Sequence, residues 1–360
     1  MKRIGILTSG GDCQGLNASI RGVAKSLYEE FGNDVEIYGI KDGYKGLIFG
    51  EYKLMKPEDF SGILTLGGTI LGTSRQPFKT MCLPMPEFGG KTKLDMMLEN
   101  YRKYKFDCLV ILGGNGTQKT ANLLREEGLN VVSLPKTIDN DVWGTDMTFG
   151  FHSSVEIATN VLDCIHTTAT SHGRIFCVEI MGHKVGWLPL YAGIAGGADV
   201  ILLPEIPYDI DKIAKTLDNR IANGKKFSIL AVAEGALSKE EAAMKKKDFK
   251  KARAEMKYPS IVYRLADELA SRVDNEIRVC VPGHFQRGGS PCAYDRVLST
   301  RFGAAAARLI REKNYGNMVG LVNGKIVPVP LSEVAGKLKT VPVDCEEILA
   351  AREIGISFGD

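Results

Sequence analysis

Several sequence patterns that mark special classes of protein are missing here. The eight cysteines form no C-x-x-C pair, which argues against a zinc site or a disulfide framework and suits a reducing compartment. No apolar span reaches the roughly 18 residues of a membrane helix, and the apolar run at residues 4–7 is too short for a signal peptide. Charge of one sign is not in excess, because 46 basic and 43 acidic residues leave +3. We therefore expect a cytoplasmic protein whose main partner is neither nucleic acid nor a membrane.

Two common nucleotide-binding patterns are absent as well. Neither G-x-G-x-x-G nor G-x-x-x-x-G-K-S/T occurs, so the chain has no standard dinucleotide site and no Walker A loop. Glycine itself is abundant, with 40 in 360 residues and no G-X-Y period, so many positions should form tight turns or approach a ligand closely. The length, with 44% hydrophobic and 25% charged residues, indicates a globular protein with two cores.

Short apolar runs that end in glycine or polar turns alternate with helical patterns, which predicts the α/β class with mostly parallel sheets. The predicted strands are Ile4–Thr8, Val35–Ile40, Cys108–Leu112, Val131–Leu134, Ile175–Ile180, Val200–Leu203, Phe227–Ala233 and Ile277–Val281. The predicted helices are Leu16–Phe31, Lys93–Lys103, Gln118–Glu127, Ser153–Thr170, Ile210–Ala222, Ser260–Arg272 and Tyr294–Glu312. Most of the strands are almost continuously apolar, so they should be buried on both faces.

One segment differs from the rest in composition. Residues 238–257 are highly charged and rich in Ala, Glu and Lys. We interpret this segment as a solvated surface helix, with a basic patch for nucleic acid as the alternative.

Two segments bring glycines from a strand to the start of a helix, and these are residues 4–17 and 110–117. Backbone amides without side chains, together with a helix N-terminus, favour an anion such as phosphate. A third turn, residues 67–75, adds Arg75, which can hold phosphate through two parallel donors. Turns at the carboxyl ends of neighbouring parallel strands meet at the ligand crevice of such a sheet. Each turn alone is also compatible with a plain tight turn.

Polar and charged residues follow two further predicted strands. The turn at 134–141 carries Asp139 and Asp141, which could divide proton abstraction and metal binding between them, although turn hydrogen bonding alone also explains acidic residues there. The turn at 282–291 carries His284 and Arg287 beside glycines, with Arg278 upstream, which indicates a second phosphate pocket. Arg278 could instead be a surface cation, and Arg174 is another candidate for this pocket.

Taken together, these segments resemble the 6-phosphofructokinase family, specifically its bacterial-type, mixed-substrate group. The motifs run in family order across nearly the whole chain: GGDCQGLNASIRG at 10–22, GGTILGTSR at 67–75, GGNGT at 113–117, PKTIDND at 135–141, MGH at 181–183 and PGHFQRGGSP at 282–291. The GGNGT motif alone is also similar to NAD kinases and lipid kinases, which are not expected to carry PKTIDND and GHFQRGG.

The resemblance implies an ATP-dependent enzyme that phosphorylates the 1-hydroxyl of fructose 6-phosphate in glycolysis, with Mg²⁺ as cofactor and fructose 1,6-bisphosphate as product. It implies that Asp139 is the general base and that Thr137 and Arg174 also belong to the catalytic set. The implied donor-binding residues are Gly11, Arg75, Gly114, Asn115, Gly116 and Thr117. The implied sugar-phosphate residues are Thr137, Asp139, Arg174, Met181, Gly182, His183, Glu234, Arg278, His284, Phe285, Gln286 and Arg287. In the family, the arginines that match Arg174 and Arg278 come from a neighbouring subunit, which implies a homodimer or homotetramer.

The family fold implies two Rossmann-like three-layer domains with the active site in the cleft between them. We expect residues 1–150 plus 286–336 to bind the phosphoryl donor, and residues 151–285 plus 337–360 to bind fructose 6-phosphate.

Four positions depart from the usual family pattern or bear on the donor. Family enzymes that use ATP have Gly at the position of Gly116, where pyrophosphate enzymes have Asp, because a carboxylate there would occupy the space of the α-phosphate and repel it. Lys136 points the other way, since pyrophosphate enzymes usually carry this lysine. Asn115 replaces an acidic residue near the metal, so that Asp141, donor phosphates and water would hold most of the Mg²⁺. His183 replaces an arginine, so it is positively charged only when protonated.

We give Gly116 more weight than Lys136 and expect ATP to be the donor, because an ammonium is tolerated beside ATP phosphates whereas a clash of like charges is not. Two alternatives stay open from the sequence. One is a pyrophosphate-dependent fructose 6-phosphate 1-phosphotransferase. The other is a nucleotide-sensing binding protein on the same fold, which would have no need of a base such as Asp139.

Overall fold

The computed structural model describes all residues from 1 to 360, and the chain forms two compact units. The first unit consists of Met1–Ser153 and Arg287–Lys339, and the second of Ser154–Gln286 and Thr340–Asp360. No helix is both long enough and apolar enough to cross a membrane.

The first unit is built around a seven-stranded sheet in the order β11-β10-β5-β4-β1-β2-β3. Its strands are β1 Lys2–Ser9, β2 Val35–Ile40, β3 Tyr52–Met55, β4 Cys108–Gly113, β5 Val131–Pro135, β10 Asn317–Val322 and β11 Lys325–Pro330. All neighbours are parallel except the two pairs at the edges, β2–β3 and β10–β11. Strands β3, β10 and β11 were not predicted. β3 is short and mostly exposed, and β11 contains two prolines, which a sheet accepts at its edge.

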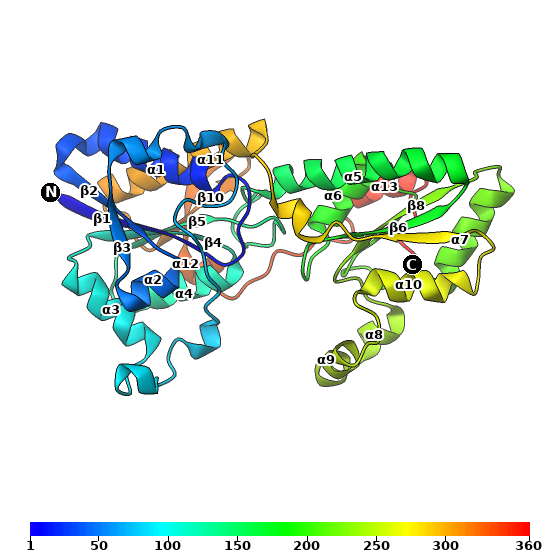
Figure 1. The fold of residues 1–360 in the computed structure, drawn as a ribbon, viewed down its shortest axis with the longest axis horizontal. Helices are drawn as coiled ribbons and strands as arrows, with labels where there is room; N and C mark the ends of the chain where they lie inside the picture. Colours follow the sequence, from blue (N-terminus) through cyan, green and yellow to red (C-terminus); the bar gives the residue numbers. More distant parts are fainter. The chain divides into compact units, whose positions relative to one another are not determined.

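Helices cover both faces of this sheet (Figure 1). α1 Leu16–Phe31 and α11 Ala293–Arg311 pack side by side on one face. The other face carries α2 Tyr44–Phe49, α3 Lys93–Lys103, α4 Asn115–Glu126 and α12 Leu331–Val334. Glycines allow α1 and α11 to approach closely, because a Cβ on Gly303 would lie 2.6 Å from the backbone nitrogen of Val23.

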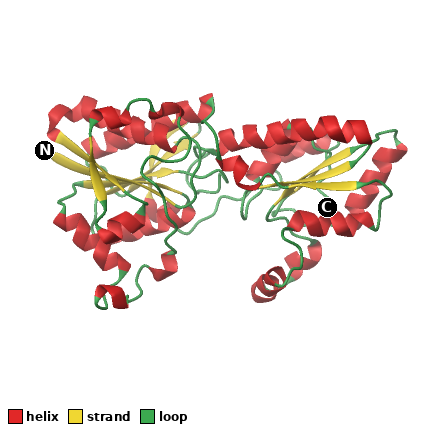
Figure 2. Ribbon diagram, in the orientation of Figure 1, coloured by secondary structure: helices red, strands yellow, loops and turns green.

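The second unit has a four-stranded parallel sheet in the order β7-β8-β6-β9 (Figure 2). Its strands are β6 Ile175–Ile180, β7 Val200–Leu202, β8 Ser228–Ala233 and β9 Ile277–Cys280. α7 Ile210–Ala222 and α10 Ile261–Ala270 share a buried cluster with one face, and α5 Phe151–His172, α6 Trp187–Ala195 and α13 Glu346–Glu353 lie on the other. β6, β7 and β8 are buried throughout, and β7 is covered although it is an edge strand, because Val200 forms a bridge with Ser357. The other edge strand, β9, is partly exposed.

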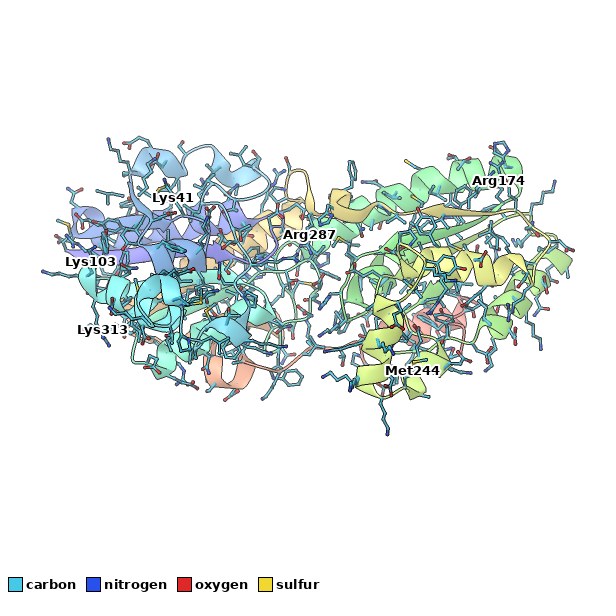
Figure 3. All side chains as sticks on the ribbon, turned by 60° about the horizontal axis from the view of Figure 1, so that its bottom comes forward. Lys41, Lys103, Arg174, Met244, Arg287 and Lys313 are labelled. Atoms are coloured by element: carbon cyan, nitrogen blue, oxygen red, sulfur yellow. The ribbon has the colours of Figure 1, made fainter.

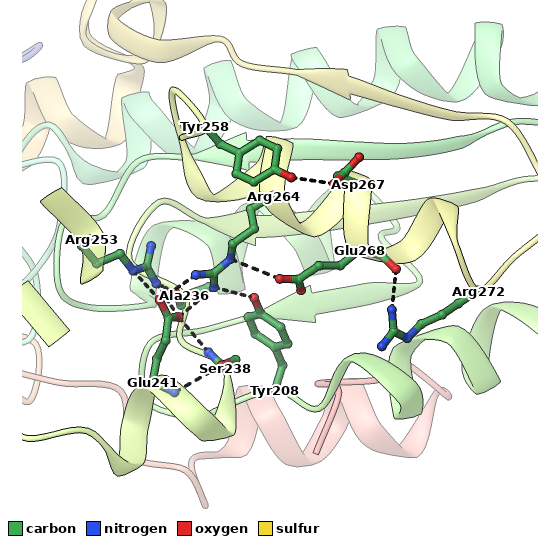
Figure 4. A network of polar contacts seen from close by, with 10 residues as sticks. All are labelled: Tyr208, Ala236, Ser238, Glu241, Arg253, Tyr258, Arg264, Asp267, Glu268 and Arg272. Carbon is green, nitrogen blue, oxygen red and sulfur yellow. Dashed lines mark hydrogen bonds and ion pairs between the residues drawn. The ribbon is translucent and has the colours of Figure 1, made fainter. Parts of the chain in front are cut away.

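The charged segment at 238–257 is not a single solvated helix. It forms two short helices, α8 Lys239–Ala243 and α9 Lys246–Ala254. α9 has no buried residue and fits the expectation, but the Glu241 side chain in α8 is only 5% exposed. Arg264 donates to Glu241 at 2.7 Å, Arg253 donates to it at 2.8 Å, and Arg264 also donates to the hydroxyl of Tyr208 at 3.1 Å (Figure 4). A carboxylate can be buried here because two guanidinium groups neutralise it.

Candidate active site

Three of the predicted turns of the first unit follow three adjacent strands and therefore lie side by side at the carboxyl ends of these strands. β1, β4 and β5 are neighbours, and their last residues are in register, Ser9 with Gly113 and Gly113 with Pro135. The chain order reverses at β1, which has β2 on one side and β4 on the other. This is the position at which open α/β sheets bind ligands.

The remaining predicted turn, residues 67–75, is hydrogen-bonded to the glycine turn that follows β1. The amide of Gly10 donates to the carbonyl of Ser74 at 3.1 Å, and the Thr73 hydroxyl donates to the Gly10 carbonyl at 2.7 Å. Gly10 has a φ of +86°, a left-handed conformation that favours glycine. These bonds bring Arg75, the exposed residue after Ser74, beside the turn that carries Gly11.

The second glycine turn forms the start of α4. The helix begins at Asn115 rather than at the predicted Gln118, so Gly114 is its N-cap and Gly116 lies in its first turn. Apart from its chain neighbours and the backbone of its own helix, no heavy atom lies within 4 Å of the position that a Cβ on Gly116 would take. An exposed helix N-terminus with open space beside it is suited to an anion.

Lys136 is buried beneath the glycine turns. Its ammonium donates to the carbonyl of Gly11 and lies 3.7 Å from the Cβ position of Gly10. Burial lowers the pKa of Lys136, and Arg287 lowers it further, whereas nearby Asp139 partly opposes the effect. In this structure the lysine therefore holds the first glycine turn.

The acidic turn is held by a set of short-range bonds. The Asp139 amide donates to the Thr137 hydroxyl at 3.1 Å, and the Thr148 hydroxyl donates to the Thr137 carbonyl at 2.8 Å. Asn140, between the two acidic residues, has a φ of +53°. Its side-chain oxygen accepts from the Thr148 amide at 3.0 Å. Asp139 remains partly exposed, whereas Asp141 is buried.

Asn115 and Asp141 form a pair that suits a metal ion. The amide nitrogen of Asn115 donates to the carboxylate of Asp141 at 2.7 Å, and Asn115 Oδ1 is buried without a hydrogen-bond partner. Burial raises the pKa of Asp141, and the bond from Asn115 opposes this only in part. A carboxylate and an amide oxygen are hard ligands of the kind that Mg²⁺ accepts together with phosphates and water. No group of three or more His, Cys, Asp or Glu side chains could hold a metal ion.

Arg287 also lies in the first unit, at the first glycine turn. It donates to the Asp12 carbonyl at 3.0 Å, its Nη1 lies 3.1 Å from the Cβ position of Gly11, and its buried Nε has no partner. Of the residues that we expect to hold the sugar phosphate, Arg287 shares the first unit only with Thr137 and Asp139. Figure 3 labels its position in the fold.

In the second unit, one group of predicted residues meets at the carboxyl ends of β6, β8 and β9. Glu234 Oε1 accepts from the amides of Gly182 and His183 at 3.2 and 2.6 Å, and Gln286 Oε1 accepts from the Met181 amide at 3.1 Å. His183 has a φ of +53° and is exposed. Glu234 thus shapes the Met181–His183 turn with at least one of its oxygens.

The same turn region includes His284 and Phe285, which are both exposed. The Phe285 side chain is 73% exposed, a large value for an aromatic residue. Both belong to the short helix at Gly283–Arg287, which follows β9.

Arg174 and Arg278 lie elsewhere in the second unit. Both form ion pairs with Glu276, at the amino ends of β6 and β9. Arg174 follows the end of α5 (Figure 3). The six residues of β6 separate Arg174 from the Met181–His183 turn, a span of about 20 Å for an extended strand. One copy of the chain therefore does not bring Arg174 to the same place as that turn.

The structure adds residues that the sequence did not point out. The Lys339 ammonium donates to Asn140 Oδ1 and to the Thr145 carbonyl, both at 2.9 Å, and to the Asp146 carbonyl at 2.8 Å. Burial lowers the pKa of Lys339 to about 7, and the charges of Asp146 and Asp141 oppose this. Lys339 is 199 positions from Asn140, and no motif marks it.

Comparisons with known proteins agree on one family. A family model described as phosphofructokinase matches residues 3–310. The ATP-dependent 6-phosphofructokinase of Spirochaeta thermophila is 56% identical over 360 residues, covering 100% of this chain and 98% of that protein. A protein of the same name from Propionibacterium freudenreichii is 47% identical and covers 99% of each chain.

Solved structures are similar as well. Phosphofructokinase from Pichia pastoris in the T-state aligns with a TM-score of 0.79 and 33% identity, covering 92% of this chain but only 35% of the longer Pichia chain. A pyrophosphate-dependent phosphofructokinase from Marinobacter aquaeolei also gives a TM-score of 0.79, covering 99% of this chain and 92% of that chain. At 21% identity, that second match concerns the fold alone.

Proposed function

The chain belongs to the phosphofructokinase family, and on that premise we propose that it transfers the γ-phosphoryl group of ATP to the 1-hydroxyl of fructose 6-phosphate. One observation carries this proposal. The glycine turns, the open N-terminus of α4 and the turn with Asp139 lie together at one edge of the first sheet. Relatives along the full length that are named ATP-dependent 6-phosphofructokinases support it.

The donor phosphates are expected to bind at the glycine turns of the first unit. Backbone amides of Gly11 and Gly114–Thr117, with the positive end of α4, favour a polyphosphate, and Arg75 adds charge. The open space at Gly116 accommodates the part of ATP that an acidic side chain would repel.

Asp139 acts as the general base in this proposal. As the 1-hydroxyl oxygen attacks the γ-phosphorus, the carboxylate takes its proton, the bond from phosphorus to the bridging oxygen breaks, and ADP leaves. Thr137 holds the backbone of Asp139 in place for this step. Because the reaction requires mainly alignment and charge neutralisation, the rigid turn contributes directly to the rate.

Asp141 and Asn115 would hold Mg²⁺, with the remaining ligands from ATP phosphates and water. Bound there, the ion would neutralise charge on the phosphoryl groups. Asn115 Oδ1, which is buried and has no protein partner, supports this assignment.

The sugar phosphate is expected to bind to Met181–His183, Glu234 and His284–Gln286 of the second unit, with Arg287. We further propose a homodimer or homotetramer in which Arg174 and Arg278 of each subunit complete the site of a neighbour. The separation of Arg174 from the Met181–His183 turn supports such sharing, and Arg278 is paired with the same Glu276 as Arg174.

One assay tests the reaction and its donor. Purified protein is given fructose 6-phosphate with MgATP or with pyrophosphate, and sugar-dependent ADP and fructose 1,6-bisphosphate are measured. We expect turnover with MgATP. Turnover with pyrophosphate alone would establish the transferase that Lys136 favours, and binding of ATP without sugar-dependent ADP would establish the nucleotide-sensing protein.

A variant tests the base. Asp139→Ser should lower kcat by about 10² to 10⁴, the usual contribution of a general base, with little change in sugar binding. An unchanged kcat in folded Asp139→Ser protein would remove Asp139 from the mechanism.

A further inference from the structure

A short stretch near the end of the first unit runs beside the acidic turn. Leu338 forms an antiparallel bridge with Val142, and the amide of Lys339 donates to the carbonyl of Asp141 at 2.9 Å. Lys339 is the last residue of this unit before the chain enters the second. The segment therefore follows the backbone immediately after the expected base.

The side chain of Lys339 reaches across the same turn. Its ammonium donates to Asn140 Oδ1 and to the carbonyls of Thr145 and Asp146, all within 2.9 Å. An ammonium has three protons to donate. The lysine thus ties the first part of the 139–148 loop to its middle.

Asn140 is the critical residue among these partners. It has a left-handed φ of +53°, a conformation that asparagine adopts more readily than other residues except glycine, because its side chain can form local hydrogen bonds. Its side chain accepts from Lys339 and from the Thr148 amide, and donates to the Asp146 carbonyl at 3.3 Å. The backbone of Asn140 sets the directions in which the flanking residues, Asp139 and Asp141, leave the turn.

We propose that Lys339 is a positioning residue for phosphoryl transfer, which holds Asn140 so that the Asp139 carboxylate keeps its reactive orientation. This inference rests on the proposed function of Asp139. Lys339 has no direct part in the chemistry and acts through the turn. Loss of such support moves a reacting group by a fraction of an ångström to an ångström, which can reduce turnover by about 10².

The test compares two lysines of one segment. Lys339→Met removes the three bonds, whereas Lys337→Met removes an exposed ammonium that lies 5.6 Å from the Trp143 ring centroid. With MgATP and fructose 6-phosphate, Lys339→Met should lower kcat by about 10- to 100-fold and change each KM by less than about threefold. Lys337→Met should retain wild-type kinetics. Lys339→Arg, which keeps the charge and donors, should recover part of the lost kcat.

A double variant separates positioning from general loss of structure. In an Asp139→Ser background, Lys339→Met should reduce the residual kcat by less than about threefold, because the group it positions is gone. Equal losses in both backgrounds, or an unchanged kcat in the single variant, would overturn the proposal.

Hydrogen exchange provides a readout that does not depend on activity. Amides of residues 139–148 should exchange faster in Lys339→Met, or in Lys339→Gln if the first variant does not fold, than in Lys337→Met. Unchanged exchange would refute the role of Lys339 in the turn. If wild-type protein makes no sugar-dependent ADP, the proposed function fails. The exchange experiment still tests Lys339 in that case, because faster exchange in the Lys339 variant means that Lys339 holds the turn, and unchanged exchange means that it does not.

Discussion

Replacing Gly116 by Asp tests how the donor is chosen. The residue lies in the first turn of α4, and a Cβ placed there meets no atom within 4 Å apart from its chain neighbours and the backbone of its own helix. The first atom of a side chain therefore meets no clash at this position. An acidic residue in the first turn of a helix even stabilises the helix, by about 0.3–1 kcal/mol. We expect the folded protein to keep its stability while its use of ATP declines.

The magnitude follows from the charge that the carboxylate brings to the donor site. Two like charges about 4 Å apart repel by about 4 kcal/mol at an effective dielectric constant near 20, and by about 1 kcal/mol in bulk water. Gly116 is exposed, so the true value lies between these limits. Since about 1.4 kcal/mol corresponds to a factor of ten, kcat/KM for ATP should decrease by roughly 5-fold to 10³-fold.

The assay measures kcat/KM for MgATP at saturating fructose 6-phosphate in Gly116→Asp and Gly116→Asn. The two side chains have nearly the same shape and differ in charge, so the asparagine variant measures the steric part of the loss. Thermal unfolding verifies that both variants fold. If the aspartate and asparagine variants lose the same amount of kcat/KM, charge repulsion at this position does not select the donor.

Two further predictions concern the stability of the second unit and the sharing of the site between subunits. Glu241→Gln should destabilise the protein by about 3 kcal/mol at pH 7, since removing one member of a buried ion pair leaves its partners unpaired. Burial acts to raise the pKa of Glu241, but bonds from Arg264 and from the Ser238 amide, with the Arg253 charge, outweigh it and lower the pKa below 4.5. The stabilisation by Glu241 is therefore present above the pKa of the unfolded state and is lost as the pH falls through the pKa of the folded state. In urea unfolding, the difference in unfolding free energy between wild type and variant should be smaller near about pH 4 than at pH 7. A difference that does not change with pH would contradict this. Mixed oligomers of Asp139→Ser and Arg278→Ala subunits should regain activity that neither variant has alone. In them, some sites combine the intact Asp139 of one subunit with the intact Arg278 of its neighbour. Mixed oligomers as inactive as their parents would exclude a shared site.

The parts of the fold that the sequence predicted best are those in which local pattern and final position agree. Strands β1, β4 and β5 are apolar runs followed by glycine or polar turns, and their central place in a parallel sheet requires burial on both faces. The same pattern predicted both edge strands of the second sheet, yet β7 is buried, with a bridge from Val200 to Ser357, whereas β9 is partly exposed. An edge position is not encoded in periodicity.

The candidate site divides in the same way. Glycine turns and the 135–141 segment are continuous motifs, so their chemistry could be interpreted from the sequence. Lys339 could not be found in that way, because its role depends on a contact across 199 positions. Arg287 shares a motif with His284 but lies against Gly11 and Asp12, since the chain passes between units just before it.

The segment at 238–257 is anchored at both of its ends by one buried carboxylate. Glu241 precedes α9, Arg253 stands near the end of α9, and the two are bonded to each other. The lysines between them, at 245–247, 250 and 251, are exposed. The ion pair between Glu241 and Arg253 therefore closes this stretch into a loop, and it would keep the two ends together after a protease cuts between them. The exposed residues between them are a suitable place to insert a peptide tag.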